Sequence, residues 1–419
     1  MTTFYDALET RSREARQAAL MAALPQQILH AQQASPAFAG ILAGVDAAGV
    51  TSRAALARLP VTRKSELLAL QQQHRAPGGS GNVFGGFSAL AFGAAMPRVF
   101  ASPGTLYEPE GTRRDYWRVA RAMYAAGIRP GELVHNAFSY HFVPAGSMME
   151  SGAHALGCTV FPGGTGQTEQ QVQAIAELRP QAYAGTPSFL KIIVEKAASM
   201  GIPLPSMRRA LVSGEAFPPS LRDWLAERGI HAYQCYATAD LGLIAYETEA
   251  REGLVLDEGV IVEIVRPGTG DPVPEGEVGE LVVTTLNPDY PLIRFGTGDL
   301  SAVLPGTCPT GRTHTRIKGW MGRADQTTKV RGMFVHPGQI AEVVRRFPEV
   351  LKARLVVGGE MANDHMTLRL ESTSSDPGLA DRVGDAVRDV TKLRGTIELA
   401  PPGSLPNDGK VIEDTRTYQ

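Results

Sequence analysis

The sequence predicts an α/β protein: a large N-terminal domain built on mainly parallel sheets with a β subdomain, then a small C-terminal α+β domain. Three observations support this. Short apolar strands alternate with amphipathic helices from about residue 113 to 236, β-rich segments follow at 253–285, and helices and strands mix again after about residue 325. Strands alternating with helices are typical of a parallel sheet with right-handed crossovers. We expect the domains to be residues 1–322 and 323–419,.

The first domain is expected to open with helices. Residues 5–73 are rich in Ala, Leu, Gln and Arg, and Thr62 can cap a helix whose first turn holds Glu66,. A loop rich in Gly and Ser follows at 76–86. The pattern then predicts helices at 113–128, 168–178, 187–200 and 219–228, alternating with strands at 133–138, 182–184, 209–213 and 231–236,.

The later segments change character. Residues 253–265 and 277–285 are β-rich and are separated by a turn at 267–272, which predicts hairpins of a β subdomain,. The small C-terminal domain is expected to contain helices at 338–347 and 380–393 and strands at 354–357, 366–371 and 396–399.

Charge and cysteine content narrow the class of protein. The 41 Lys and Arg balance 43 Asp and Glu, which argues against a nucleic-acid-binding protein or a polybasic membrane-bound protein,. The three cysteines are widely spaced and indicate neither a disulfide framework nor a CxxC redox site,. No apolar signal segment opens the chain, and no apolar run reaches the ~18 residues of a membrane helix,. We expect a soluble, cytoplasmic protein without nucleic-acid or membrane partners.

Several common catalytic signatures are absent. The chain has no GxxxxGK, GxSxG or HExxH motif and no βαβ unit with GxGxxG, which disfavours P-loop NTPases, α/β-hydrolases, zincins and Rossmann dehydrogenases,. Ligands of parallel sheets bind beyond the carboxyl ends of the strands. We therefore expect the chemistry in the loops that follow the strands, at 139–146, 185–188, 213–215 and 237–240.

A set of motifs in a fixed order carries a family resemblance. From about Phe38 to Arg416 the chain resembles the acyl-adenylate-forming ligases, and among them the phenylacetate–CoA ligase family. The motifs are LPVTRK (59–64), FASPGT (100–105), GGTGQT (163–168), GTPS (185–188), SGE (213–215), PLIRFGTGD (291–299), GRTH (311–314), GRAD (322–325), KVRG (329–332) and GSLPNDGK (403–410).

The resemblance implies an ATP-dependent, AMP-forming acid–CoA ligase. The carboxylate would attack the α-phosphate of ATP to give an acyl-adenylate and pyrophosphate, and CoA would then displace AMP. The implied substrates are a small carboxylic acid, ATP and CoA, with Mg²⁺ as cofactor. Two alternatives stay open: the acceptor is an amine or a carrier-protein thiol, or the protein binds an adenylate or acid without turnover. A homodimer also stays open.

The resemblance assigns roles around the nucleotide. A carboxylate held by a glycine turn can accept two hydrogen bonds from a ribose diol, and Asp299 is expected to have this role,. The same sequence pattern also fits an Asp that only caps its own turn. Arg323 is expected to touch the nucleotide, and Asp325 to be the hinge about which the small lid domain rotates. Lys410 is expected to stabilise the charge of the adenylation transition state, and Lys329 and Arg331 to assist nucleotide binding,.

Two further segments are expected to face the nucleotide. By resemblance, Tyr236 lies near adenine, Thr238 offers a hydroxyl to the α-phosphate, with Ala239 as the other position for that slot, and Asp240 holds Mg²⁺,. A helix N-cap is the alternative for Asp240. The turn formed by Ser213, Gly214 and Glu215 is expected to contact adenine through its backbone.

The phosphate loop departs from the family pattern. Ser102, Gly104 and Thr105 can still cradle phosphate through backbone N–H groups,. Tyr107 and Glu108 replace the family's Gly and Lys, so Glu108 is expected to repel the triphosphate and weaken ATP binding. Mg²⁺, rotation of Glu108 into solvent, or a partner among Arg113 and Arg114 would reduce that repulsion.

Aromatic residues after a central strand favour a flat, aryl-type acid. The expected acid pocket consists of Phe138, Tyr140, His141, Gly185, Thr186 and Pro187. Core packing is the equal alternative for Phe138 and for Phe142, and His135 is expected to be an interior histidine. One thiol at Cys308 with His314 does not make a four-ligand site, so no zinc is expected,.

Overall fold

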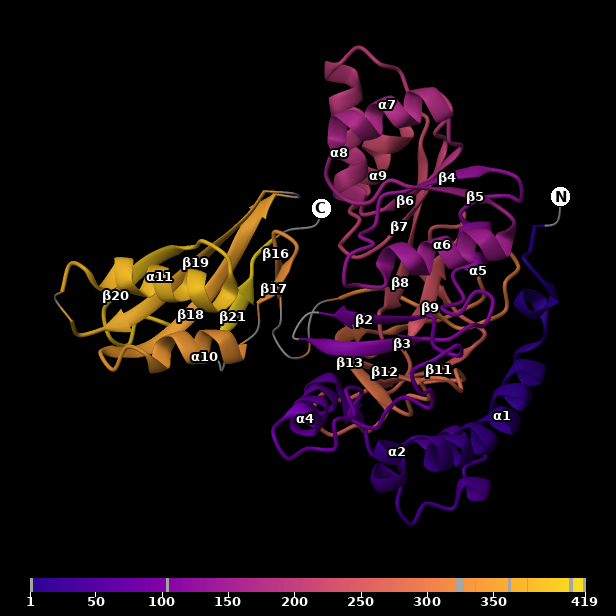
Figure 1. The fold of residues 1–419 in the computed structure, drawn as a ribbon, viewed down its shortest axis with the longest axis horizontal. Coiled ribbons are helices and arrows are strands. Elements are labelled where there is room, and N and C mark those ends of the chain that lie inside the picture. Colours follow the sequence, from indigo (N-terminus) through magenta and orange to yellow (C-terminus); the bar gives the residue numbers. More distant parts are fainter. Residues whose placement is uncertain are drawn as a thin grey trace. The chain divides into compact units, whose positions relative to one another are not determined.

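The computed structural model divides into two compact units, Met1–Gly322 and Arg323–Gln419, which we describe separately (Figure 1). It describes residues 3–102, 105–321, 324, 328–335, 337–360, 363–374, 376–406 and 410–416. None of the helices in these ranges is long and apolar enough to cross a membrane.

A nine-stranded sheet dominates the first unit, in the order β14-β15-β10-β9-β8-β7-β6-β4-β5. Five neighbouring strands run parallel: β8 (His231–Thr238), β7 (Arg209–Val212), β6 (Ala182–Gly185), β4 (Leu133–Asn136) and β5 (Thr159–Pro162). The antiparallel remainder comprises β9 (Gly242–Glu247), β10 (Leu254–Leu256), β15 (Arg316–Ile317) and β14 (Val303–Leu304). The predicted α/β class is confirmed, with a large sheet that is parallel from β8 to β5 and antiparallel from β14 to β8.

Helices connect the parallel strands in two groups. They are α5 (Ala120–Ala125), α6 (Ala145–Leu156), α7 (Thr168–Leu178), α8 (Pro187–Ser199) and α9 (Pro219–Ala226). The strand order reverses between the adjacent strands β4 and β6, since the chain leads from β4 outward to β5 and from β6 the other way to β7. Right-handed crossovers therefore place α6 on one face and α7, α8 and α9 on the other,. Figure 1 shows α5 beside α6, and α7, α8 and α9 gathered apart from them.

In this region one predicted helix is largely wrong and one helix was not predicted. The helix expected at 113–128 shrinks to α5, because Asp115 and Arg118 adopt positive φ angles of 52° and 65° that no helix tolerates. Helix α6 is missed, since its two glycines lower helix propensity,. Gly152 is needed there, because a Cβ would lie 2.9 Å from the Val119 side chain.

A second sheet has the order β1-β13-β12-β11. Its strands are β1 (Thr62–Arg63), β13 (Phe295–Ser301), β12 (Gly279–Thr285) and β11 (Val260–Val265), and β2 (Arg98–Ser102) and β3 (Leu106–Glu110) form a separate hairpin. Thr62 pairs with Phe295 in β1, so the predicted helix cap at Thr62 is wrong. The helix begins at Lys64, and the Arg63 N–H donates to Glu66 Oε2 at 3.0 Å.

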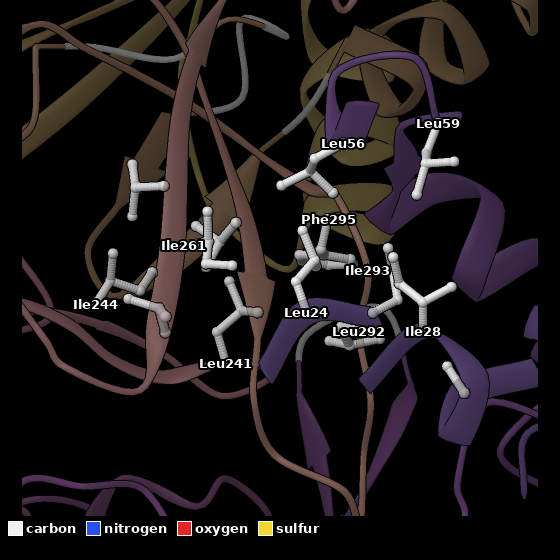
Figure 2. Close-up of a cluster of buried hydrophobic side chains, with 14 of the residues drawn as sticks. Leu24, Ile28, Leu56, Leu59, Leu241, Ile244, Ile261, Leu292, Ile293 and Phe295 are labelled. Atoms are coloured by element: carbon white, nitrogen blue, oxygen red, sulfur yellow. The ribbon is translucent and has the colours of Figure 1, made fainter. Parts of the chain in front are cut away.

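The N-terminal helices complete the core of this sheet. They are α1 (Arg13–Ala34), α2 (Pro36–Ile41), α3 (Arg53–Leu56) and α4 (Lys64–Arg75), with 3₁₀ turns at Ala7–Thr10 and Ala47–Gly49. Leu24 and Ile28 lie four residues apart on one face of α1 and are buried in the same cluster as Leu56, Ile293 and Phe295 (Figure 2),. Burying each such side chain stabilises the fold by about 1.5–3 kcal/mol. This cluster fixes β13, which carries the candidate site.

The second unit contains two sheets. One is the hairpin of β16 (Thr328–Val330) and β17 (Met333–Val335); the other has the order β20 (Thr396–Ala400), β19 (Asn363–Ser372), β18 (Val350–Glu360) and β21 (Ile412–Asp414). Helices α10 (Pro337–Arg345) and α11 (Leu379–Thr391) pack on the larger sheet through a core that includes Leu355, Leu368 and Val383. The helices and strands expected for the C-terminal domain are confirmed, with shifted ends.

Candidate functional site

Asp299 lies within β13, and both of its carboxylate oxygens accept hydrogen bonds. The Tyr236 hydroxyl, from β8, donates to Oδ2 at 2.6 Å, and the Trp320 indole Nε1 donates to Oδ1 at 3.1 Å. Strands β8 and β13 belong to different sheets, so the contact joins two of the predicted nucleotide-binding motifs. Trp320 was not predicted as a site residue, and its only signal in the sequence is its place just before the predicted hinge motif.

The predicted phosphate loop is the turn of the β2–β3 hairpin. Ser102 and Leu106 face each other at the end of the ladder, and the Thr105 N–H donates to the Ser102 carbonyl at 3.1 Å. Thr105 has a φ angle of 62°, a left-handed conformation that few residues other than glycine adopt,. Gly104 lies outside the described residues.

Glu108 is buried, so the expected rotation of its side chain into solvent is wrong, while the expected repulsion of the triphosphate stays a prediction. Glu108 is only 2% exposed, and the Ser102 hydroxyl donates to its Oε1 at 2.9 Å. Burial, and then the nearby charge of Asp240, raise the pKa of Glu108 well above its usual range,. The raised pKa favours the uncharged form of this carboxyl. Arg113 and Arg114 bind Asp289 and a backbone carbonyl instead.

Asp240 lies between Glu108 and Lys64. The Lys64 ammonium donates to Asp240 Oδ2 at 3.0 Å. Asp240 Oδ1 and Glu108 Oε2 are both buried and have no N–H or O–H donor among the residues that the structure describes. A proton on Glu108 would satisfy both oxygens, and so would a hard cation, which prefers carboxylate ligands. Lys64 was not predicted as a site residue, although it is the last residue of the LPVTRK motif.

The turn after β7 is held on both sides. The Ser213 hydroxyl donates to the Cys235 carbonyl at 2.8 Å, and Glu215 Oε1 accepts the Ser188 N–H at 2.7 Å. Gly214 between them has a φ angle of 85°, which an L side chain rarely adopts,. The backbone of this turn is thus fixed next to the start of α8.

The loop after β6 begins at the point where the strand order reverses, the usual place for a ligand crevice,. A Cβ at Gly185 would lie 2.1 Å from the Tyr183 hydroxyl oxygen, so only glycine fits there. Thr186 caps α8 by accepting the Phe189 N–H at 3.3 Å, and Pro187 opens that helix,.

The loop after β4 borders the same point of reversal. The Tyr140 hydroxyl accepts from Asn136 Nδ2 at 2.7 Å and donates to Glu150 Oε2 at 2.8 Å, so its ring is held by two polar partners. His141 is exposed, and its N–H donates to the Ser139 hydroxyl at 3.1 Å.

The two phenylalanines of this loop differ in burial. Phe138 is buried, and a Cβ at Gly214 would lie 3.7 Å from its ring, so Phe138 adjoins the predicted adenine-binding turn. Phe142 is 81% exposed, which excludes core packing. His135 is buried with its Nε2 at 2.7 Å from Gln171 Oε1, and burial lowers its pKa, as befits an interior histidine.

Other predicted residues have structural partners. Thr238 Oγ1 accepts the Leu241 N–H at 3.1 Å in the turn between β8 and β9, and Ala239 lies in the same turn. In the second unit, Lys329 lies in β16, and both the N–H and the Nε of Arg331 donate to Asp364.

Lys410 is exposed and follows an anchored segment of the second unit. The Lys352 ammonium donates to the Pro406 carbonyl at 2.8 Å, and Glu371 Oε1 accepts the Leu405 N–H at 2.6 Å. The predicted residues Arg323 and Asp325 lie outside the described residues. Within the ranges described, no group of three or more His, Cys, Asp and Glu side chains could hold a metal ion, and Cys308 contacts Thr310 Oγ1 at 3.1 Å.

Comparison with known proteins points to one family. Residues 114–287 match the family described as AMP-binding enzyme. The chain is 31% identical over 437 residues to the phenylacetate–coenzyme A ligase of Thermus thermophilus, covering 95% of both chains. It is 35% identical over 266 residues to the phenylacetate–coenzyme A ligase of Escherichia coli, covering 60% of each.

Solved structures share the fold. A 2-hydroxyisobutyryl-CoA ligase bound to its acyl-AMP and CoA superimposes with a TM-score of 0.84 at 24% identity, over 100% of this chain and 93% of that one. The amide bond synthetase McbA of Marinactinospora thermotolerans has a TM-score of 0.56 at 20% identity, over 76% and 68% of the two chains.

Proposed function

The chain belongs to the phenylacetate–coenzyme A ligase family, as its motifs predicted, and we propose that it is an AMP-forming ligase that joins a small carboxylic acid to CoA. A carboxylate oxygen attacks the α-phosphorus of ATP, a new P–O bond forms, and pyrophosphate leaves with the electrons of the broken bond. The CoA thiol then loses its proton to solvent and attacks the acyl carbonyl, and AMP departs. The observation that carries this proposal is the convergence of Asp299 and Tyr236, which brings two nucleotide motifs together.

The nucleotide would be held by the first unit. Asp299 accepts the ribose hydroxyls, which take the place of the Tyr236 and Trp320 donors on its two oxygens,. Tyr236 lies against adenine, and the fixed turn Ser213, Gly214 and Glu215 meets its edge through backbone groups. Ser102, Gly104 and Thr105 would surround the phosphates, with the Thr238 hydroxyl toward the α-phosphate.

Asp240 is the residue we propose for Mg²⁺. Its buried Oδ1 has no donor and lies in a pair of carboxyl groups, a donor set that fits a hard cation,. When bound, the ion supplies charge neutralisation to the phosphates. The chain's own part is to keep Asp240 fixed through Lys64 and Glu108.

The acid would bind where the strand order reverses. Phe138, Tyr140 and His141 border the site from the loop after β4, and Gly185, Thr186 and Pro187 from the loop after β6. Flat aromatic walls with the polar Tyr140 hydroxyl suit an aryl or other small acid,.

The second unit would act as the lid. Lys410 supplies a positive charge to the adenylation transition state, from a segment whose preceding residues are anchored by Lys352 and Glu371,. Arg323, Lys329 and Arg331 are proposed to assist at the nucleotide, and Asp325 to be the hinge between the two half-reactions. ATP and CoA are substrates available in the cytoplasm, which supports that location.

The non-catalytic alternative rested on repulsion between a charged Glu108 and the triphosphate. Burial and the neighbouring Asp240 raise the pKa of Glu108, which favours its uncharged form and supports an enzyme over a binding protein. An amine or a carrier-protein thiol as acceptor is distinguished by experiment. Pyrophosphate release should appear with some members of a panel of carboxylic acids, and acyl-CoA should form when CoA is added. Amide formation without acyl-CoA would contradict the CoA assignment, and no pyrophosphate with any acid would contradict the ligase itself.

A further inference from the structure

The phosphate loop lacks a basic residue of its own. The hairpin segment from Ser102 to Glu110 reads SPGTLYEPE and contains no Lys, Arg or His. A triphosphate carries about four negative charges, and phosphate sites in proteins ordinarily supply a cation. Backbone N–H groups and a single Mg²⁺ leave part of that charge unbalanced. A basic side chain from another element would complete the site.

Lys64 lies close to the loop through a short chain of contacts. Its ammonium is 3.0 Å from Asp240 Oδ2, Asp240 interacts with Glu108, and Glu108 Oε1 accepts from the hydroxyl of Ser102, the first residue of the loop. The Lys64 side chain is 40% exposed, whereas the carboxyl groups beside it are buried. A ligand that enters from solvent can therefore reach the Lys64 side chain.

The helix that carries Lys64 is fastened to the loop hairpin. Gln71, on α4, donates from Nε2 to the Tyr107 carbonyl at 2.8 Å and accepts the Tyr107 N–H at 2.8 Å. Arg75, one turn further on, donates to the Thr105 carbonyl at 3.1 Å. These bonds fix the position of Lys64 relative to the loop.

The neighbouring basic residues are committed elsewhere. Arg75 bonds Gln71 and the Thr105 carbonyl and stacks on the Tyr107 ring, 4.8 Å from its centroid. Arg63 pairs with the buried Glu280 at 2.6 Å. Lys64 is instead paired with Asp240, the proposed magnesium ligand, so its ammonium lies where phosphate oxygens would approach the ion.

We propose that Lys64 contacts the phosphates of ATP and supplies the positive charge that the phosphate loop lacks. This assignment rests on the proposed function. An ammonium has three N–H donors, so a bond to Asp240 is compatible with a bond to a phosphate oxygen. Charge-assisted hydrogen bonds of this kind are about twice as strong as neutral ones.

The test compares ATP with adenosine, measured by titration calorimetry on the full chain. Lys64→Met should weaken ATP binding about 10-fold or more and leave adenosine binding within about 2-fold, since a charged hydrogen bond is worth about 1.5–3 kcal/mol. Lys64→Arg should stay close to the unmodified protein. Lys191→Met is the matched control, because Lys191 is also 40% exposed and paired with a carboxylate.

A second arm separates a direct contact from an effect through the metal. The Lys64→Met loss of ATP affinity should persist in EDTA, where no ion is held by Asp240. If it disappears in EDTA, or if adenosine weakens as much as ATP, Lys64 acts only on Asp240 or on the fold, and the proposal is overturned. If Lys64→Met does not fold, Lys64→Gln is used with the same criteria. Failure of the unmodified protein to bind ATP would contradict the proposed function as well, whereas unchanged ATP affinity in the variant contradicts this assignment alone.

Discussion

The Tyr236 hydroxyl and the Asp299 carboxylate form a 2.6 Å hydrogen bond between two different sheets. The two residues are 63 positions apart in the sequence. Tyr236 reaches Asp299 because β8 crosses from the parallel part of the large sheet into its antiparallel part, and β13 is fixed by the core of the second sheet. The bond occupies an oxygen that a ribose hydroxyl would use.

Replacing Asp299 should therefore weaken the protein's recognition of the ribose hydroxyls. Asp299→Asn removes one acceptor and the negative charge, and we expect ATP affinity to fall about 10-fold. The unmodified protein should prefer ATP over 2′,3′-dideoxy-ATP, and the variant should lose most of that preference. Asp271→Asn, at an exposed turn, is the control. Undiminished discrimination in Asp299→Asn would place the ribose elsewhere.

Lys410 should matter for one half-reaction. Lys410→Ala should reduce adenylate formation at least ~10²-fold, the scale of losing one transition-state charge contact. Thioester formation from supplied acyl-adenylate should survive. Both rates are measured separately, with Lys392→Ala as a control, since Lys392 is an exposed lysine of the same unit. Equal loss of both half-reactions would contradict the assigned role.

Asp325 should matter for the change between half-reactions. Asp325→Pro restricts φ to about −65° at the proposed hinge. Adenylation should continue while thioester formation collapses, and Asp325→Ala should keep both. Normal thioester formation by the proline variant would show that the hinge lies at another residue.

Asp115 should make stability depend on pH. Its carboxylate accepts the Val119 and Ala120 N–H groups, and burial raises its pKa to about 6. In the unfolded chain the pKa is about 3.9, so the folded state holds a proton that the unfolded state releases between these values. This contribution to stability is therefore complete below about pH 4 and is lost as pH rises through about 6.

Asp115→Asn removes that dependence. Asparagine tolerates the φ angle of 52° at this position, keeps one acceptor for the helix and does not ionise,. Between pH 4 and 7 the free energy of unfolding, from urea denaturation, should fall by about 2–3 kcal/mol less in the variant than in the unmodified protein. Parallel pH profiles for the two proteins would contradict the raised pKa.

Much of the fold was predictable because local patterns and topology agree in the parallel sheet. Helices such as Thr168–Leu178 are delimited by their own apolar spacing, and each lies between two strands. Helix α6 was not predicted because its glycines lower helix propensity, and their role in close packing is visible only in the tertiary structure. The 113–128 segment failed for a similar reason, since the positive φ of Asp115 leaves no trace in residue spacing.

The residues of the candidate site could be named from motifs, but their charges and burial could not. Asp299 and Tyr236, both assigned to the nucleotide by their motifs, are in contact, and their nucleotide-binding roles stay predictions. The burial of Glu108 depends on which side of the β2–β3 hairpin its side chain faces, and the approach of Lys64 depends on how α4 docks on that hairpin. Neither follows from a linear motif, so a repulsive carboxylate was expected where a buried carboxyl with a raised pKa lies near a lysine.

The most direct test of the acyl-adenylate route traces an ¹⁸O label from the carboxylic acid into AMP. The protein is supplied with an accepted carboxylic acid whose carboxylate is labelled with ¹⁸O, together with ATP, Mg²⁺ and CoA, and the AMP product is analysed by mass spectrometry. If the carboxylate attacks the α-phosphate and CoA then displaces AMP, one labelled oxygen stays on the phosphate of AMP. Unlabelled AMP together with label in pyrophosphate or inorganic phosphate would contradict the acyl-adenylate route.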